Sequence, residues 1–317
     1  MKSSKFSIII LSYNSGKRIE ILHNALKKRL VREDIEYEII IIDDGSADDS
    51  YEYALTLEKN ENAVRAFQLS KNFTSHYSIF AGFSLVEGTC AIALPDDFQV
   101  PLDTVIEMYR LWENGGKVII PYRDTRIDPF MTRFISNIYY CVMNLLSEIK
   151  FPKGGADIFL ADKEIVDIFN KHIHPKNTST IIEVLRLGFD PVFVSMQRPK
   201  GTNTKSRWSV SKKIRLALDT FFSSSSFPIK FISALGIWSF ILSVALIIYY
   251  LYARFSGVIE IPGWTLLVIT ITFFSGLILL SLGIIAEYIW RIFDEVKGRP
   301  GFILKKKEIQ DQRLKKE

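Results

Sequence analysis

Residues 6–43, FSIIILSYNSGKRIEILHNALKKRLVREDIEYEIIIID, contain two apolar runs separated by a stretch with helical spacing. The runs at 6–11 and 37–43 are dominated by isoleucine, which is typical of strands that are buried on both faces. The stretch at 15–30 has apolar residues three and four apart and begins with a serine, which indicates an N-capped helix. The order strand, helix, strand predicts two parallel strands joined by a crossover helix.

The same alternation continues toward the middle of the chain. A helical stretch at 46–60, which begins with serine and aspartate, is followed by a strand-like run at 63–70. A third helical stretch at 74–88 and a fourth strand-like run at 90–97 come next. Repeated strand–helix units predict an α/β domain with a mostly parallel sheet covered by helices on both faces. We expect this domain to occupy residues 1–210.

Two uncharged apolar runs lie near the end of the chain, at 231–252 and 261–286. Each is long enough to cross a hydrocarbon core of about 30 Å, and the mean hydropathy of the chain is positive at +0.14. A pair of buried core helices is the alternative, although such helices are normally shorter and interrupted by polar residues. The runs therefore predict a two-helix transmembrane hairpin within residues 230–290.

Basic residues are concentrated on the outer sides of the two runs, whereas the link between them offers only Arg254 as a positive charge. Because positively charged flanks stay in the cytoplasm, we expect a multi-pass inner-membrane protein with its α/β domain facing the cytoplasm. Residues 211–229 are expected to form an interfacial amphipathic helix, and residues 291–317 a basic cytoplasmic tail. We therefore attribute the formal net charge of +5 to basic residues that face the membrane, and not to a surface that binds nucleic acid.

Polar clusters follow three of the predicted strands. In parallel sheets, ligands bind beyond the carboxyl ends of the strands, so these clusters are expected to face one crevice. Turn formation and capping of the following helices are the alternatives for individual residues. The clusters comprise Ser12, Tyr13 and Asn14 after the first strand, Asp43 and Asp44 after the second, and Asp96, Asp97 and Gln99 after the fourth.

The paired carboxylates indicate a nucleotide and a metal ion. A carboxylate at a strand end accepts hydrogen bonds from a ribose hydroxyl or a base N–H, which favours Asp43 and Asp44 as nucleotide ligands. Charges at the edge of a core are costly without compensation, and a divalent cation, Mg²⁺ or Mn²⁺, would compensate Asp96 and Asp97. The sequence contains neither G-x-G-x-x-G nor a P-loop, so a dinucleotide or P-loop site is not expected.

The chain resembles glycosyltransferase family 2, and within it the polyprenyl-phosphate glycosyltransferases, over nearly its whole length. The resemblance implies a GT-A fold and transfer of one sugar from a nucleotide-sugar, with UDP as the default nucleotide, to undecaprenyl or another polyprenyl phosphate for cell-envelope glycan modification. The similar segments are SYNSG at 12–16, IIIDDGSADDS at 40–50, LSKNFTSHYSIFAGF at 69–83, GGADIFLADKEIVD at 154–167, TKSRWSVSKKIRLALD at 204–219 and IAEYIWRIFDEVKGRPGFIL at 285–304.

The resemblance also implies roles for single residues. It places Asp157 at a catalytic carboxylate near the acceptor, and it adds Ser70, Asn72 and Asp96 to the strand-end residues that bind the nucleotide-sugar. Asp97 is the expected metal ligand and second catalytic carboxylate.

Gln99 and Asp96 are the further metal ligands that the resemblance implies. Two positions depart from the family's metal motif, because Pro95 stands where it begins with aspartate and Val100 replaces another aspartate.

Cations are needed to grip the acceptor phosphate, which is already anionic at neutral pH. The candidates are Arg123, Arg126, Lys205 and Arg207, for which ordinary anchoring to anionic lipid is the alternative. The family also suggests a homo-oligomer.

Two other functions remain open from the sequence. One is a processive, polysaccharide-synthase type of transferase with the same fold. The other is a non-catalytic membrane scaffold that binds a nucleotide-sugar.

Overall fold

The computed structural model describes residues 4–123, 158–176, 178–196, 227–256 and 264–305. The chain divides into two compact units. The first is formed by the N-terminal part of the chain together with the segment that begins at Pro300, and the second by the helices before Arg299.

A mixed sheet forms the centre of the first unit, and in the described part of the chain it has seven strands in the order β3-β2-β1-β4-β6-β5-β7. The prediction of a mostly parallel sheet is confirmed, because only β6 runs antiparallel to its neighbours β4 and β5. The strands are β1 (Phe6–Ser12), β2 (Tyr37–Asp43), β3 (Val64–Gln68), β4 (Cys90–Pro95), β5 (Val118–Arg123), β6 (Leu160–Asp162) and β7 (Val192–Met196).

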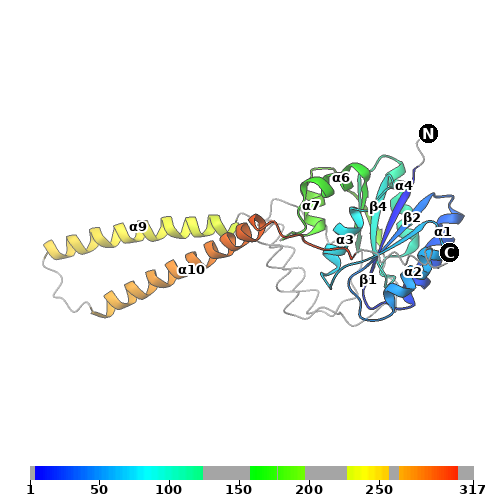
Figure 1. Ribbon diagram of the computed structural model, residues 1–317. Helices are drawn as coiled ribbons and strands as arrows, with labels where there is room; N and C mark the ends of the chain where they lie inside the picture. The colour runs from blue at the N-terminus through cyan, green and yellow to red at the C-terminus, as the bar shows by residue number, and fades with distance from the viewer. Residues whose placement is uncertain (1–3, 124–157, 177, 197–226, 257–263, 306–317) are drawn as a thin grey trace. The chain divides into compact units, whose positions relative to one another are not determined.

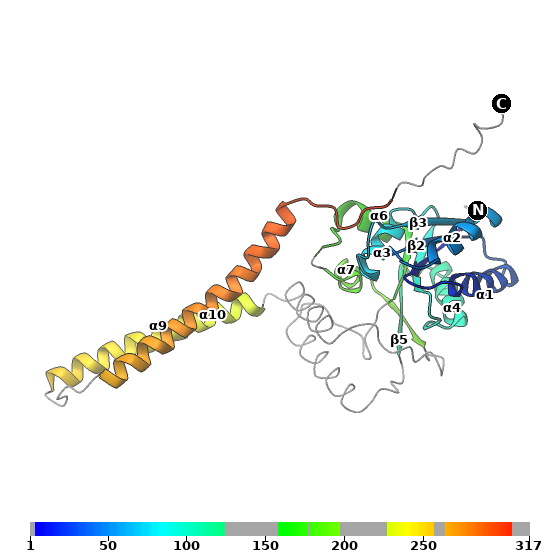
Figure 2. The ribbon, with the colours of Figure 1, turned by 60° about the horizontal axis from the view of Figure 1, so that its bottom comes forward.

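Helices cover both faces of this sheet, as the strand–helix alternation predicts. Figure 2 shows α1, α2 and α4 on one side of the strands and α3, α6 and α7 on the other. The helices are α1 (Arg18–Arg32), α2 (Ser50–Asn60), α3 (Ser75–Phe83), α4 (Leu102–Glu113), α6 (Lys163–His172) and α7 (Thr180–Arg186).

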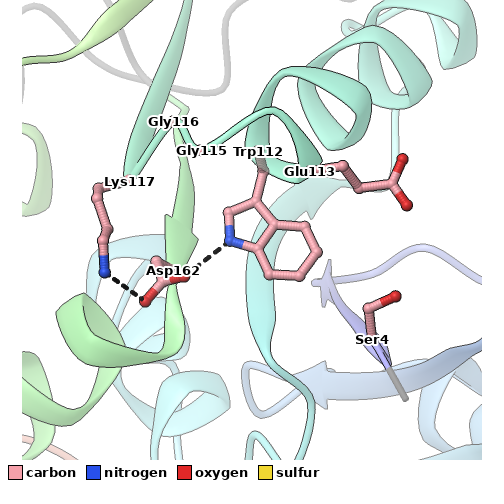
Figure 3. Close-up of a pocket in the computed structure, with 7 residues that line it drawn as sticks. All are labelled: Ser4, Trp112, Glu113, Gly115, Gly116, Lys117 and Asp162. Carbon is pink, nitrogen blue, oxygen red and sulfur yellow. Dashed lines mark hydrogen bonds and ion pairs between the residues drawn. The ribbon is translucent and has the colours of Figure 1, made fainter. Parts of the chain in front are cut away.

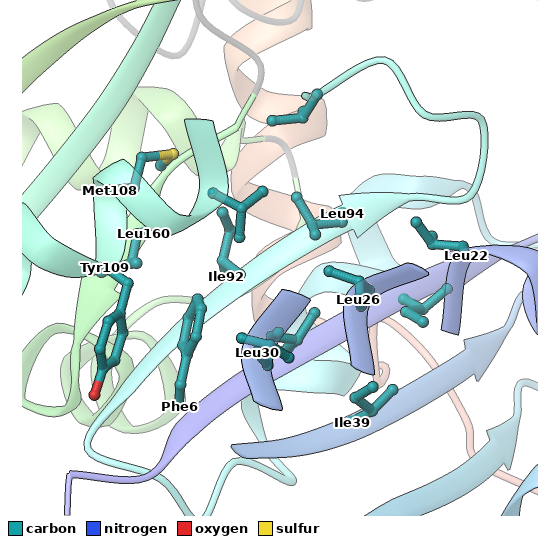
Figure 4. Close-up of a cluster of buried hydrophobic side chains, with 14 of the residues drawn as sticks. Phe6, Leu22, Leu26, Leu30, Ile39, Ile92, Leu94, Met108, Tyr109 and Leu160 are labelled. Carbon is teal, nitrogen blue, oxygen red and sulfur yellow. The ribbon is translucent and has the colours of Figure 1, made fainter. Parts of the chain in front are cut away.

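The core is built from the strand residues that point to the α1 side of the sheet. Ile39, Ile92 and Phe6 are fully buried there, and Leu26 of α1 and Tyr109 of α4 pack over them (Figure 4). Each such side chain contributes about 1.5–3 kcal/mol on burial. This core holds the parallel strands in register and thereby sets the positions of their carboxyl ends.

The predicted serine cap of the first helix is wrong. α1 begins at Arg18, with Lys17 at the N-cap and no side-chain cap hydrogen bond. Ser15 Oγ instead accepts a hydrogen bond from the backbone N–H of Tyr13 at 3.1 Å.

The second predicted helix also begins later than its sequence pattern indicates. α2 starts at Ser50 with Asp49 at its N-cap, and Ser46 lies in the preceding loop. The Ser46 hydroxyl donates to Asp43, and its oxygen accepts a hydrogen bond from the backbone N–H of Asn14 at 2.9 Å and not from a helix N–H.

Two long helices, α9 (Phe227–Phe255) and α10 (Trp264–Val296), make up the described part of the second unit. They run side by side and contact each other (Figures 1 and 2). Among the described residues, one segment, Phe273–Val296, is long and apolar enough to cross a membrane, with a mean hydropathy of 1.8. It lies further along the chain than the predicted run at 261–286, and the two-span hairpin stays a prediction.

Candidate active site

The sheet register places the polar strand ends next to one another. Ser12 at the end of β1 is paired with Asp43 at the end of β2, and Asp43 is paired with Gln68 at the end of β3. On the other side of β1, Leu11 is paired with Pro95, directly before the two aspartates that follow β4. The register therefore places these clusters at one edge of the sheet, and the expectation that they face one crevice stays a prediction.

Asp43 is fully buried and is held from two sides. Its Oδ2 accepts hydrogen bonds from the backbone N–H of Ser46 at 3.0 Å and from Nε2 of Gln68 at 2.9 Å, and its Oδ1 accepts one from the Ser46 hydroxyl. A buried carboxylate with this many donors has a fixed orientation. Asp43 thus joins the loop after β2 to the end of β3.

Asp44 is also buried, and it organises the loop that follows β3. Its Oδ1 accepts a hydrogen bond from the backbone N–H of Phe73 at 2.7 Å, and its Oδ2 accepts one from Thr74 at 2.9 Å. Burial, with a smaller contribution from the charge of Asp43, raises the pKa of Asp44 to about 6, and these hydrogen bonds oppose the shift.

Gly45 allows the loops after β2 and β3 to approach each other closely. Its φ is +65°, and a Cβ at this position would lie 2.5 Å from the backbone carbon of Lys71. Only glycine fits such a position without strain. The contact brings the exposed residues Ser70 and Asn72 beside the two aspartates.

The loop after β1 contacts the same region. Asn14, with φ +47°, donates its backbone N–H to Ser46 Oγ at 2.9 Å and accepts from the backbone N–H of Ala47 through Oδ1 at 3.2 Å. Ser12 is buried, and its hydroxyl has no hydrogen-bond partner among the described residues. Tyr13 is 37% exposed.

An arginine that the sequence interpretation missed connects this loop to the end of β4. Arg18 Nη2 donates to the carbonyl oxygen of Asn14 at 3.1 Å and forms an ion pair with Asp96 Oδ2 at 3.3 Å. Asp96 is buried, and the guanidinium of Arg18 offsets its charge, while its assignment as a metal ligand stays a prediction. The first turn of α1 carries no motif that would have identified this pairing.

Asp97 is more accessible than Asp96 and lies beside Gln99. Its carboxylate accepts hydrogen bonds from both the backbone N–H and the side-chain amide of Gln99. The described residues contain no group of three or more His, Cys, Asp and Glu side chains that could hold a metal. Mg²⁺ commonly takes one or two protein carboxylates and completes its shell with water and substrate phosphates, so Asp97 fits such an ion.

Among the remaining predicted site residues, Arg123 lies at the same edge, because β5 and β4 both run antiparallel to β6 and are therefore parallel to each other. Arg123 ends β5, but its side chain is not described. The other four, Asp157, Arg126, Lys205 and Arg207, lie outside the described residues.

The opposite end of the parallel strands, where those strands begin, carries two polar features that the sequence interpretation missed. Glu38 at the start of β2 is buried and accepts hydrogen bonds from Ser7 Oγ at 2.6 Å and from the backbone N–H of Gly88 at 3.0 Å. It also forms ion pairs with Arg65 at 2.7 Å and with Lys5 at 3.6 Å.

The second feature is a cavity of about 340 Å³ (Figure 3). Across it, Trp112 Nε1 donates to Asp162 Oδ2 at 2.9 Å, and Lys117 lies 3.6 Å from the same carboxylate. Because Lys117 precedes β5 and Asp162 ends the antiparallel β6, this cavity is remote from the strand ends that carry the candidate site. Its lining residues are Ser4, Trp112, Glu113, Gly115, Gly116, Lys117 and Asp162.

Comparison with known proteins assigns the family. The profile of the family described as glycosyl transferase family 2 matches residues 7–160, which include β1 except Phe6, β2 to β4 and the loops described above. CsbB of Bacillus subtilis is 31% identical over 99% of this chain and 95% of its own length. The undecaprenyl-phosphate 4-deoxy-4-formamido-L-arabinose transferase of Photorhabdus laumondii is 27% identical over 95% of this chain and 94% of its own.

A bactoprenol glucosyl transferase of Shigella phage SfII is 25% identical over 95% of this chain and 98% of its own length. Among solved structures, glucosyl-3-phosphoglycerate synthase from Mycobacterium tuberculosis covers 68% of this chain and 76% of its own, with 13% identity and a TM-score of 0.46. The extent of the similarity to CsbB and the match to the family profile show that the chain belongs to glycosyl transferase family 2.

Proposed function

We propose that the protein is a membrane-bound glycosyltransferase that moves one sugar from a nucleotide-sugar to a polyprenyl phosphate. The observation that carries the proposal is the clustering of Asp43, Asp44, Asp96 and Asp97 at one edge of a mostly parallel sheet. Relatives that are similar over nearly their whole length are named for transfer to bactoprenol and undecaprenyl phosphate. The product would be a lipid-phosphate-sugar for cell-envelope glycan modification.

The nucleotide-sugar is proposed to bind against the ends of β1 to β3, with UDP as the first nucleotide to test. The buried hydroxyl of Ser12 and the exposed ring of Tyr13 border this region, and Ser70 and Asn72 lie on the loop that Asp44 holds. Asn14 and Asp43 fix the backbone around Ser46. Backbone groups held in this way give a preorganised surface for a polar ligand.

A divalent cation, Mg²⁺ or Mn²⁺, is proposed to be held by Asp97, with Gln99 and Asp96 as additional ligands. Such an ion neutralises the negative charge that develops on a diphosphate leaving group. The ion pair between Asp96 and Arg18 supports our choice of Asp97 as the principal ligand.

In the transfer itself, an oxygen of the acceptor phosphate attacks the anomeric carbon while the bond from that carbon to the nucleoside diphosphate breaks. The acceptor oxygen is already anionic at pH 7, so it needs positioning and charge balance more than deprotonation. We assign the positioning to Asp157, and the binding of the acceptor phosphate to Arg123, Arg126, Lys205 and Arg207.

Membrane attachment is proposed to use both long helices. α10 contains the candidate span described above, and α9 includes the uncharged run at 231–252. With an amphipathic helix at 211–229 and a basic tail at 291–317, this arrangement gives a multi-pass inner-membrane protein whose domain at 1–210 faces the cytoplasm.

The test is sugar transfer by the full-length protein in detergent. Radiolabelled nucleotide-sugars are offered with a short polyprenyl phosphate, and lipid-linked product is extracted into organic solvent. We expect one donor to give product, EDTA to abolish the reaction, and Asp97→Ala to lower the rate roughly 100-fold or more. The matched control is Asp190→Ala, at an exposed aspartate before β7.

A rate of sugar transfer that changes neither with EDTA nor with Asp97→Ala would contradict the mechanism. Nucleotide-sugar binding without transfer to any acceptor would favour a non-catalytic scaffold, and products with several added sugars would favour a processive transferase.

A further inference from the structure

The last described residues of the chain lie beside the end of β3, which is the outermost strand of the central sheet. Residues 301–305, which we call the C-terminal strap, begin shortly after α10 ends at Val296. Leu304 forms an antiparallel bridge with Leu69. The backbone N–H of Ser70 donates to the carbonyl of Ile303 at 2.8 Å, and that of Lys305 donates to the carbonyl of Gln68 at 2.8 Å. β3 is the edge strand of the sheet, so the strap covers backbone groups that would otherwise be open.

Lys305 also fixes the side chain of Gln68. Its Nζ donates to Gln68 Oε1 at 2.9 Å, and Gln68 Nε2 donates to Asp43 Oδ2 at 2.9 Å. An ammonium group only donates hydrogen bonds and a carboxylate only accepts them. The amide between them therefore has a single favourable orientation, with its oxygen toward Lys305 and its nitrogen toward Asp43.

The other end of the strap is anchored by a close contact. A Cβ on Gly301 would lie 2.4 Å from Cγ of Pro175 and 3.1 Å from Cε1 of Tyr77, so the backbone is pressed against these two side chains. Tyr77 belongs to α3, the helix that follows the loop bound by Asp44. In Figure 2 the strap is the dark red trace that runs past α6 and α3.

We propose that the C-terminal strap is a functional part of the nucleotide-sugar site, in which Lys305 and Gln68 act as positioning residues for Asp43. The strap holds the end of β3, and through Gln68 it sets the orientation of the Asp43 carboxylate. This inference rests on the proposed function, because it assumes that the donor nucleotide binds at this edge.

The experiment measures the dissociation constant of UDP for the full-length protein in detergent, together with the midpoint of thermal unfolding. Lys305→Met keeps the length of the side chain but removes the charge-assisted hydrogen bond from Lys305 to Gln68. We therefore expect UDP affinity to fall about fivefold in this variant. Lys305→Arg keeps a donor and should restore affinity. Lys28→Met, at an exposed lysine of α1, is the matched control.

A second arm tests whether the lysine acts through Gln68. Gln68→Met should lower UDP affinity at least as much as Lys305→Met, and the double variant should bind UDP no more weakly than Gln68→Met alone. Additive losses would show that Lys305 does not act through Gln68 and would overturn the relay.

Equal UDP affinity in Lys305→Met and the wild type would overturn the proposal, as would a loss of affinity matched by an equal loss in Lys28→Met. A wild-type protein that binds UDP but transfers no sugar would defeat the proposed transferase function and leave the comparison of strap variants intact. A wild-type protein that binds no UDP would overturn the assignment of the strap to a uridine nucleotide site.

Discussion

Asp96 and Arg18 form an ion pair that connects the end of β4 to the first turn of α1, with 3.3 Å between Asp96 Oδ2 and Arg18 Nη2. The aspartate is buried and the arginine is one-third exposed. A carboxylate in this position depends on its partner more strongly than an exposed one would, because little water reaches it.

Removal of the arginine should therefore destabilise the domain. We expect Arg18→Gln to lower the free energy of unfolding by about 1–3 kcal/mol, since it removes the positive charge of Arg18 from beside a buried carboxylate. Urea denaturation of the detergent-solubilised protein measures the change, with the exposed Arg32→Gln as control. The double variant with Asp96→Asn should recover part of the loss, and failure to do so would show that Arg18 acts elsewhere.

Gly45→Ala should lower the free energy of unfolding more than Gly16→Ala does. Both glycines have positive φ, but only Gly45 has backbone atoms within 3 Å of a new Cβ. We expect a loss of about 2–4 kcal/mol at Gly45, where conformational strain and overpacking add, and about 1–2 kcal/mol at Gly16, where only the strain applies. Equal losses in chemical denaturation would argue against the close packing of the two loops.

Asp44 should make the domain less stable as pH rises. Burial raises the pKa of Asp44 from 3.8 to about 6, so between these values the folded state binds more protons than the unfolded state. The free energy of unfolding of the wild type, measured relative to Asp44→Asn, should fall by up to about 3 kcal/mol between pH 4 and pH 7. A difference that stays constant over this range would contradict the raised pKa.

Glu38 should have the opposite pH dependence. Burial by itself would raise the pKa of Glu38, but hydrogen bonds from Ser7 and the Glu87 N–H, together with the charges of Arg65 and Lys5, outweigh it and lower the pKa. Its stabilisation is then present above the ordinary value of 4.5 and is lost as pH falls below it.

The corresponding variant is Glu38→Gln, which should lower the free energy of unfolding by about 3 kcal/mol at pH 7. It leaves Arg65 partly unpaired, and it removes a carboxylate oxygen that accepts hydrogen bonds from several donors. The exposed Glu107→Gln is its control. A loss for Glu38→Gln that does not shrink below pH 4.5 would contradict the lowered pKa.

The strands of the N-terminal half were predictable because their composition is extreme. The run predicted at 37–43 coincides with β2, and the run at 6–11 falls one residue short of β1. Buried parallel strands of isoleucine leave little ambiguity in sequence. β6 could not be predicted, because its three residues form a strand only through pairing with β4 and β5.

The adjacency of the polar strand ends was predictable, and the contacts among their side chains were not. Parallel strands necessarily bring Ser12 and Asp43 to one edge. The partners of Asp96 and Gln68 are Arg18 and Lys305, which lie far away in sequence and depend on how helices and the chain end pack. The serine caps failed for a related reason, because the Oγ atoms of Ser15 and Ser46 accept hydrogen bonds from loop N–H groups, those of Tyr13 and Asn14, and not from a helix terminus.

The position of the strap also has a consequence for biosynthesis. The bridge between Leu69 and Leu304 cannot form until the ribosome has completed α9 and α10, so β3 emerges from it without its neighbour. At about 5–20 residues per second, the nascent domain waits on the order of ten seconds or more with this strand uncovered. A chain that terminates before residue 301 would leave the carbonyl of Gln68 and the N–H of Ser70 without these partners permanently.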